Sequence, residues 1–149
     1  MRVSDPVSSI LRKKGTEIWS LPSDATVYSA VEIMAEKHVG ALFVIDDVRL
    51  VGIISERDYA RKVILMGRAS KDTLVSEIMT TSLVTIAPEC AVDDAMRVME
   101  TNRVRHAPVV KDGSLHGMIT LGDLVKWILS TQDHTIEQLE RYITSQYPG

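Results

Sequence analysis

This chain matches itself when its sequence is shifted by 65 positions, and the match needs no gap between residues 22 and 62. A repeat of this kind constrains the fold more than any local pattern, because both copies must form the same supersecondary unit. Polar and glycine positions are matched as well as apolar ones: Gly52 with Gly117, and Asp58 with Asp123. The apolar matches are Val27/Val92, Ala30/Ala95, Met34/Met99, Val39/Val104, Val44/Val109, Leu50/Leu115 and Ile54/Ile119. We therefore predict two copies of one unit.

A shorter echo precedes each copy. Residues 7–11 (VSSIL) resemble residues 75–79 (VSEIM), and three extra residues follow the first of these segments. Each copy is thus predicted to have a lead-in segment. The predicted domains are a first repeat over residues 5–68, a second repeat over residues 69–131, and a C-terminal helix and tail over residues 132–149.

Each copy has the pattern of a mixed α/β unit. Apolar residues recur at helical spacing over residues 27–34 and 92–99, each time after a proline, Pro22 or Pro88. Short β-branched runs then predict strands, which are residues 41–45 with 50–54 in the first copy and residues 107–110 with 115–119 in the second. A helix is predicted to start after each second strand. The expected order is short strand, helix, strand, strand, helix.

Both of these last helices start with the pattern Ser/Thr-x-x-Asp. The first motif is Ser55 with Asp58, and the second motif is Thr120 with Asp123. One reading is purely structural, with each pair acting as a capping box at the start of its helix. The other is a ligand site, since two occurrences at equivalent points of a repeat are hard to attribute to capping alone.

In this order of elements, with a glycine in the second strand and the motif after it, the chain resembles the CBS domain, named after cystathionine β-synthase. The resemblance covers about residues 5–130, and the segments 52–58, 74–80 and 104–110 carry it further. It implies a stand-alone prokaryotic type of paired CBS domains, or Bateman module. The implied fold is two β-α-β-β-α repeats packed about a pseudo-twofold axis, with two clefts between their sheets.

The resemblance also implies a function. Bateman modules commonly bind AMP, ADP, ATP, related adenosyl ligands or NAD(H), and they regulate other proteins. A carboxylate such as Asp58 can accept both hydroxyls of a ribose, and hydroxyl, amide or cationic groups can hold a phosphate. We expect an adenine nucleotide as ligand, an effector protein as partner, and no catalytic residue or catalytic cofactor.

Each implied cleft takes its motif from one repeat and its base-contacting strand from the other. The first cleft would combine the following residues: Ser55, Arg57, Asp58, Thr85, Arg103, Arg105, His106, Ala107 and Pro108. The second would combine the following residues: Thr120, Asp123, Ser20, Val39, Gly40 and Ala41, with Trp19 or His38 nearby.

The two clefts differ in charge. Gly122 stands at the position of Arg57, and Gly40 stands at the position of Arg105. A phosphate should therefore prefer the first cleft, because arginine can bind it through two parallel hydrogen bonds. The alternative is that Arg103 and Arg105 form a solvated edge between a helix and a strand.

Composition excludes other classes of function. A net charge of −3, with one short cationic run at residues 12–14, argues against general nucleic-acid binding. No apolar stretch approaches the roughly 20 residues that cross a bilayer, and no signal-peptide pattern is present, so we expect a cytoplasmic protein that does not bind membranes. One cysteine, Cys90, and four scattered histidines give no metal-ligand pattern. No motif of a phosphate-binding loop or a hydrolase is found.

Three further expectations concern packing and assembly. Trp127 is predicted to be buried in the core or an interface, whereas Trp19 could either stack on an adenine or fill the core. Apolar spacing predicts an amphipathic helix within residues 136–147. We expect a homodimer formed through the repeat helices, including apolar residues of the segment 59–66. The competing function is a structural dimerisation or adaptor module with empty clefts.

Overall fold

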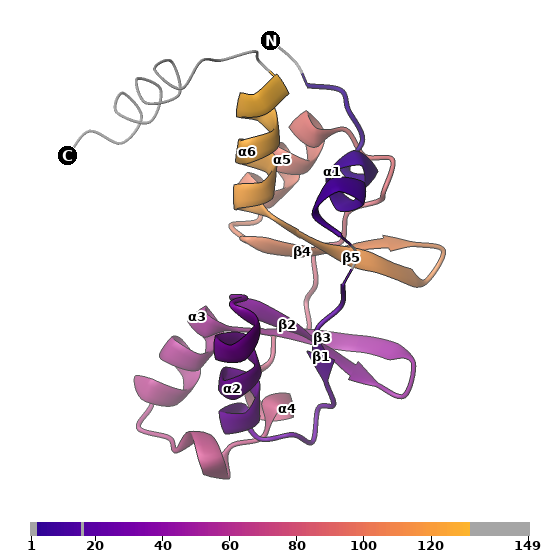
Figure 1. Ribbon diagram of the computed structural model, residues 1–149. Helices are drawn as coiled ribbons and strands as arrows, with labels where there is room; N and C mark the ends of the chain where they lie inside the picture. The colour runs from indigo at the N-terminus through magenta and orange to yellow at the C-terminus, as the bar shows by residue number, and fades with distance from the viewer. Residues whose placement is uncertain (1–2, 16, 132–149) are drawn as a thin grey trace, which may run out of the picture. The chain divides into compact units, whose positions relative to one another are not determined.

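The computed structural model describes residues 3–15 and 17–131 of the chain. These residues form two compact units (Figure 1). Unit 1 is drawn from both ends of the sequence, Met1–Thr16 and Val84–Gly149, and unit 2 is the continuous stretch Glu17–Leu83. The mixed α/β architecture predicted from the sequence is confirmed.

Unit 2 contains a three-stranded sheet in the order β1-β2-β3. β1 runs parallel to β2, and β2 pairs with β3 in antiparallel fashion. Its elements are β1 (Ser20–Leu21), α2 (Val27–Lys37), β2 (Ala41–Asp46), β3 (Arg49–Ser55), α3 (Glu56–Tyr59), a π-helical segment (Ala60–Ile64), a 3-10 turn (Ser70–Asp72) and α4 (Val75–Ile78). The predicted order of elements is therefore present in full.

Unit 1 repeats this plan with a two-stranded sheet. Its elements are α1 (Val7–Lys14), α5 (Val92–Thr101), β4 (His106–Lys111), β5 (Ser114–Thr120) and α6 (Leu121–Thr131). The predicted short strand is reduced to a single parallel bridge between Ile86 and Val109. In unit 2 the N–H of Phe43 donates to the Trp19 carbonyl and extends the ladder. Pro108 stands at the position of Phe43 and has no N–H to donate, which accounts for the shorter pairing.

The repeat is visible in single backbone conformations. His38 and Arg103, which follow equivalent helices, have φ of 56° and 55°, in the left-handed region. Asp47 and Asp112, in the equivalent hairpin turns, have φ of 55° and 51°. Because non-glycine residues rarely adopt positive φ, two matched pairs support the 65-residue register strongly.

The lead-in segments are exchanged between the repeats. In unit 1, α1 buries Val7, Ile10 and Leu11 in the core that α5, β4, β5 and α6 also line. In unit 2, α4 buries Val75 and Ile78 against the sheet and α2. The compact units therefore differ from the predicted sequence domains 5–68 and 69–131. The apolar face of each lead-in helix is covered by residues of the other repeat.

The glycine in each second strand makes room for a lead-in segment. A Cβ on Gly52 would lie 2.9 Å from the sulfur of Met79 and 3.0 Å from the carbonyl oxygen of Thr80. A Cβ on Gly117, whose φ is +154°, would lie 3.2 Å from Leu11 Cδ2. The glycines matched in the sequence thus mark where each lead-in approaches its sheet.

The predictions for the helices and for Trp127 have different outcomes. The helix predicted over residues 59–66 begins as α3 and continues as a π-helical segment, in which the Leu65 N–H donates to the Ala60 carbonyl. Trp127 packs against the core of unit 1, as expected, and donates its indole N–H to Asp5 Oδ2 at 3.1 Å. The helix predicted within residues 136–147 lies outside the described residues. Among the residues described, no helix has the length and apolar character of a membrane span.

Candidate functional site

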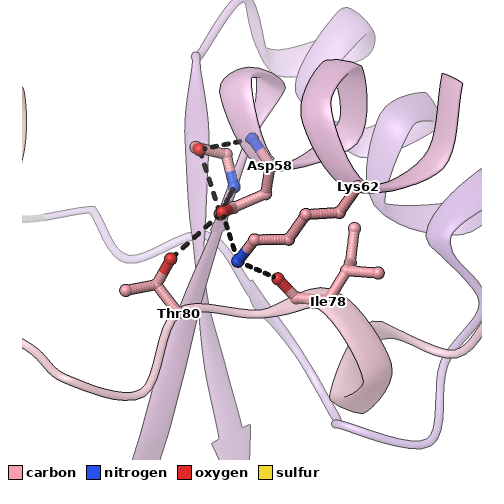
Figure 2. Close-up of polar contacts among 5 residues, drawn as sticks. Asp58, Lys62, Ile78 and Thr80 are labelled. Carbon is pink, nitrogen blue, oxygen red and sulfur yellow. Dashed lines mark hydrogen bonds and ion pairs between the residues drawn. The ribbon is translucent and has the colours of Figure 1, made fainter. Parts of the chain in front are cut away.

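The first motif lies where β3 passes into α3. The Asp58 N–H donates to Ser55 Oγ at 3.1 Å, and Asp58 Oδ2 accepts from the Ser55 N–H and hydroxyl, both at 3.0 Å. Figure 2 shows these contacts. They form a complete capping box, so the structural reading of the motif is realised. Asp58 is nevertheless an unusual capping residue, because only 7% of it is exposed.

The other oxygen of Asp58 is held by two residues that lie outside the motif. Oδ1 accepts from the Thr80 hydroxyl at 3.1 Å and lies 3.0 Å from Lys62 Nζ (Figure 2). The same ammonium donates to the Ile78 carbonyl at 2.9 Å. A buried carboxylate needs such partners to offset the loss of solvation. Ile78 belongs to the lead-in on unit 2 and Thr80 follows it directly, so Asp58 is connected to the end of that lead-in through both Thr80 and Lys62.

The second motif repeats this arrangement where β5 passes into α6. The Asp123 N–H donates to Thr120 Oγ1 at 3.0 Å, and the Thr120 N–H donates to Asp123 Oδ2 at 2.9 Å. Lys14 Nζ lies 2.6 Å from the same Oδ2 and donates to the Met118 carbonyl at 3.1 Å. The expectation that the second site carries less positive charge is thus incomplete, since Asp123 has its own lysine.

Sequence reasoning missed three residues: Lys14, Lys62 and Thr80. Lys62 stands four residues after Asp58 on the same helix, a spacing at which opposite charges pair, so it could have been found. Lys14 is 109 residues away from Asp123. Lys14 reaches Asp123 only because the lead-ins are exchanged between the repeats, and no local sequence pattern indicates this exchange.

The remaining residues predicted for the first cleft lie on both units. Arg57 of α3 is exposed in unit 2. In unit 1, Thr85, Arg103 and Arg105 are exposed, His106 is half-buried, and Ala107 and Pro108 are buried in β4. The exposure of these arginines is compatible with an anion site, and it is equally compatible with a solvated edge between a helix and a strand. Their assembly with Asp58 stays a prediction.

The residues predicted for the second cleft are also divided between the units. Ser20 is exposed in β1, Val39 and Gly40 are half-buried, and Ala41 is buried at the start of β2. Trp19 is half-buried against the core of unit 2, and Lys37 Nζ lies 4.5 Å from the centre of its ring. Trp19 therefore has a packing role already. Their assembly with Thr120 and Asp123 stays a prediction.

Unit 2 has a groove of about 630 Å³ between α2 and α3. Its lining is mainly apolar: Val31, Met34, Ala35, His38, Val39, Gly40, Glu56, Tyr59 and Ala60. Asp58 is not part of this lining, but Glu56, which lies inside the first motif, is, and so are Val39 and Gly40 of the predicted second cleft. Within the described ranges, no group of three or more His, Cys, Asp or Glu side chains could hold a metal ion.

Cys90 is half-buried just before α5, and its surroundings disfavour the thiolate. Burial raises the pKa of the Cys90 thiol, and the negative charges of Asp94 and Glu89 raise it further. The thiolate is the reactive form, so we expect Cys90 to react with Ellman's reagent at pH 8 several-fold more slowly in the folded protein than in urea. The rate should reach its half-maximum at a higher pH in the folded state. A folded rate equal to the unfolded rate would contradict this.

The comparisons with known proteins agree with this architecture. The CBS domain family model matches residues 7–64 and 75–130. The CBS domain-containing protein CBSX3, mitochondrial, of Arabidopsis thaliana is 40% identical over 154 residues, covering 97% of this chain and 74% of the relative.

Solved structures show the same fold. A putative signal-transduction protein with CBS domains from Burkholderia ambifaria has 43% identity and a TM-score of 0.83, covering 88% of this chain and 98% of that one. The CBS domain pair of protein MJ0100, solved with 5-methylthioadenosine and S-adenosyl-L-methionine, has 24% identity and a TM-score of 0.75, covering 85% and 97%. The repeat, the exchanged lead-ins and these matches lead to one conclusion: the chain belongs to the CBS domain family and carries two CBS domains.

Proposed function

We propose that this protein is a regulatory module that binds an adenine nucleotide, AMP, ATP or NAD(H), and signals its level to an effector protein. The observation that carries the proposal is the duplicated motif. Asp58 and Asp123 each stand at a strand-to-helix junction, each exchanges hydrogen bonds with the Ser or Thr three residues earlier, and each has a lysine on its carboxylate. No catalytic role is proposed for either motif.

The chemistry of the motif suits the ribose of a nucleotide. A ribose offers two adjacent hydroxyl donors, and a carboxylate can accept both of them. Asp58 Oδ2 already accepts from the Ser55 N–H and hydroxyl. A nucleotide at the first motif would therefore replace the contacts of Thr80 or Lys62 with Oδ1. At the second motif it would compete with Lys14.

The phosphate would be held by the exposed arginines. We propose that Arg57, Arg103 and Arg105 contact it in the first cleft, since guanidinium groups bind phosphate in a bidentate manner. The base would lie against the buried start of β4, at Ala107 and Pro108. In the second cleft the base would lie against Val39, Gly40 and Ala41.

The ligands of a neighbour support the class of ligand. The MJ0100 pair was solved with two adenosyl compounds, and adenosine is the part that these share with AMP, ATP and NAD(H). At 24% identity this likeness concerns the fold. It indicates that a CBS pair can accommodate adenosine, and the particular nucleotide has to be measured.

Titration calorimetry against AMP, ADP, ATP and NAD(H) tests the proposal. We expect at least one of them to bind with a dissociation constant below 1 mM, about −4 kcal/mol or tighter. If none binds, the proposed sensing function is contradicted, and the alternative of a structural dimerisation or adaptor module is favoured. Turnover of ATP or NAD(H) on prolonged incubation would instead indicate an enzyme.

We also propose a homodimer as the working assembly, formed through helices of the repeats. In the segment 59–66, Val63 is buried, but Ile64, Leu65 and Met66 are 57%, 77% and 69% exposed. Contiguous exposed apolar residues commonly mark an interface. The CBS-CP12 protein of bloom-forming cyanobacteria is described as hexameric, at 27% identity and a TM-score of 0.75. Light scattering of the purified protein would distinguish a dimer from a monomer or a larger ring.

The compartment is proposed to be the cytoplasm. The Arabidopsis relative is described as mitochondrial, so fractionation of cells that express the full-length protein is the appropriate test.

A further inference from the structure

Lys14 bridges two groups of the second motif from the end of the N-terminal arm, which we define as residues 3–14. Its ammonium lies 2.6 Å from Asp123 Oδ2 and donates to the Met118 carbonyl at 3.1 Å. Met118 belongs to β5 and Asp123 to α6. One side chain therefore fastens the end of α1 to both elements of the strand-to-helix junction. The pair is accessible to ligands, with 38% of the Lys14 side chain and 23% of the Asp123 side chain exposed.

Lys14 also stands where the chain leaves unit 1. Gly15 follows it with a φ of +98°, and the Gly15 N–H donates to the Leu11 carbonyl at 2.9 Å, which closes the last turn of α1. Unit 2 begins at Glu17. Any event that releases the Lys14 ammonium therefore acts on this last turn, directly before the chain passes to unit 2.

The rest of the arm is held independently of Lys14. The Val7 N–H donates to the Cys90 carbonyl at 2.9 Å, and Asp5 accepts from the Trp127 indole at 3.1 Å. Release of Lys14 would therefore loosen residues 12–15 and leave the buried part of α1 in place.

The two motifs obtain their lysines from different parts of the chain. There the ammonium comes from Lys62, on the helix that the motif itself starts. Trp127 stands at the position of Lys62 in the second repeat, and it is engaged with Asp5. The second repeat has no lysine of its own at this position, and the arm supplies one.

We propose that the pair of Lys14 and Asp123 is a latch on the last turn of α1, which opens when another partner takes the Asp123 carboxylate. The inference rests on the proposed function in naming that partner as the ribose of an adenine nucleotide. Asp123 Oδ2 accepts from both the Thr120 N–H and Lys14, so a ribose that donates one hydroxyl to each oxygen of this carboxylate displaces the ammonium from Oδ2. Occupancy of the second motif is then transmitted to residues 12–15.

Hydrogen exchange without ligand tests the latch itself. The readout is the Gly15 amide, compared in the wild-type protein, Lys14→Met, Asp123→Asn and the control Lys13→Met. Asn at position 123 keeps an oxygen for the Thr120 N–H and removes the charge. We expect exchange to rise about threefold in Lys14→Met and Asp123→Asn, the size of effect typical for a partly exposed ion pair, and to stay unchanged in Lys13→Met. Equal exchange in all four proteins would overturn the latch.

Binding of adenosine and of AMP tests how the latch between Lys14 and Asp123 opens. Adenosine has the ribose and lacks the phosphate, so it separates competition for Asp123 from attraction of an anion to Lys14. Saturating adenosine should raise exchange at Gly15 in the wild type and leave it unchanged in Lys14→Met. Lys14→Met should bind adenosine about threefold more tightly.

Two results distinguish the failures. If Lys14→Met binds AMP more weakly and adenosine equally well, Lys14 is a phosphate contact and the latch is wrong. If the wild type binds no adenosine compound, the proposed function fails, and the comparison without ligand alone decides whether Lys14 latches the arm.

Discussion

Asp58→Ala is expected to weaken nucleotide binding about 10- to 100-fold, and Asp123→Ala is expected to weaken it less. The carboxylate of Asp58 is the group that we assign to the ribose, and a hydrogen bond to a charged group contributes about 1.5–3 kcal/mol. In the proposed first cleft, Arg57, Arg103 and Arg105 would also bind the phosphate. Calorimetry with the nucleotide that binds best to the wild type measures both losses.

The control for this comparison is the stability of α3. Asp58→Ala removes the N3 half of the capping box, so the Ser55 N–H loses its acceptor, and it leaves Lys62 and Thr80 without their shared acceptor. Asp58→Asn keeps an acceptor for the Ser55 N–H and removes the charge. If Asp58→Asn is as stable as the wild type and still loses binding, the loss belongs to the ligand. Equal losses in Asp58→Ala and Asp123→Ala, or a larger loss at Asp123, would contradict the proposed ranking.

Ile10→Ala is expected to destabilise unit 1 by about 2–5 kcal/mol, although residue 10 belongs to the first repeat in the sequence. Ile10 is only 4% exposed and lies in the core formed with α5, β4, β5 and α6. Removing such a side chain costs transfer free energy and leaves a cavity. Hydrogen exchange should show the loss of protection in these elements and unchanged protection in β2 and β3.

Ile18→Ala is a matched control for Ile10→Ala. It deletes the same atoms at a position that is 37% exposed, where substitutions usually change stability by less than about 0.5 kcal/mol. Loss of protection in the sheet of unit 2 on Ile10→Ala would show that the arm belongs to its own repeat after all.

The strands and helices of each repeat could be predicted because they depend on short-range patterns. The register of β2 with β3 pairs Leu42 with Ile54, and that of β4 with β5 pairs Ala107 with Ile119, as the apolar runs and turn residues require. The partner of each lead-in helix could not be predicted in this way. α1 and α4 come from segments of similar sequence, residues 7–11 and 75–79, so the pattern does not say which core each helix joins.

The motif was predicted more completely than its surroundings. Ser55 with Asp58 and Thr120 with Asp123 are local, since each pair is three residues apart. Thr80 reaches Asp58 because the lead-in lies along β3, where Ile53 and Thr80 form a bridge. Lys14 reaches Asp123 for the same kind of reason. Both contacts join residues far apart in the sequence, so they depend on tertiary packing. A repeat pattern does not say which copy supplies the partner in such a contact.

The exchange of lead-ins also sets an order of events during synthesis. Unit 2 is contiguous in the sequence, so the ribosome has delivered all of it once residue 83 has emerged. The apolar face of α1 is made before unit 2 and is covered only after Leu124 and the rest of its core have been made. During that interval Val7, Ile10 and Leu11 have no sheet of their own to cover them. A chain that stops after its first repeat would keep this helix uncovered, so the burial of α1 depends on synthesis of the second repeat.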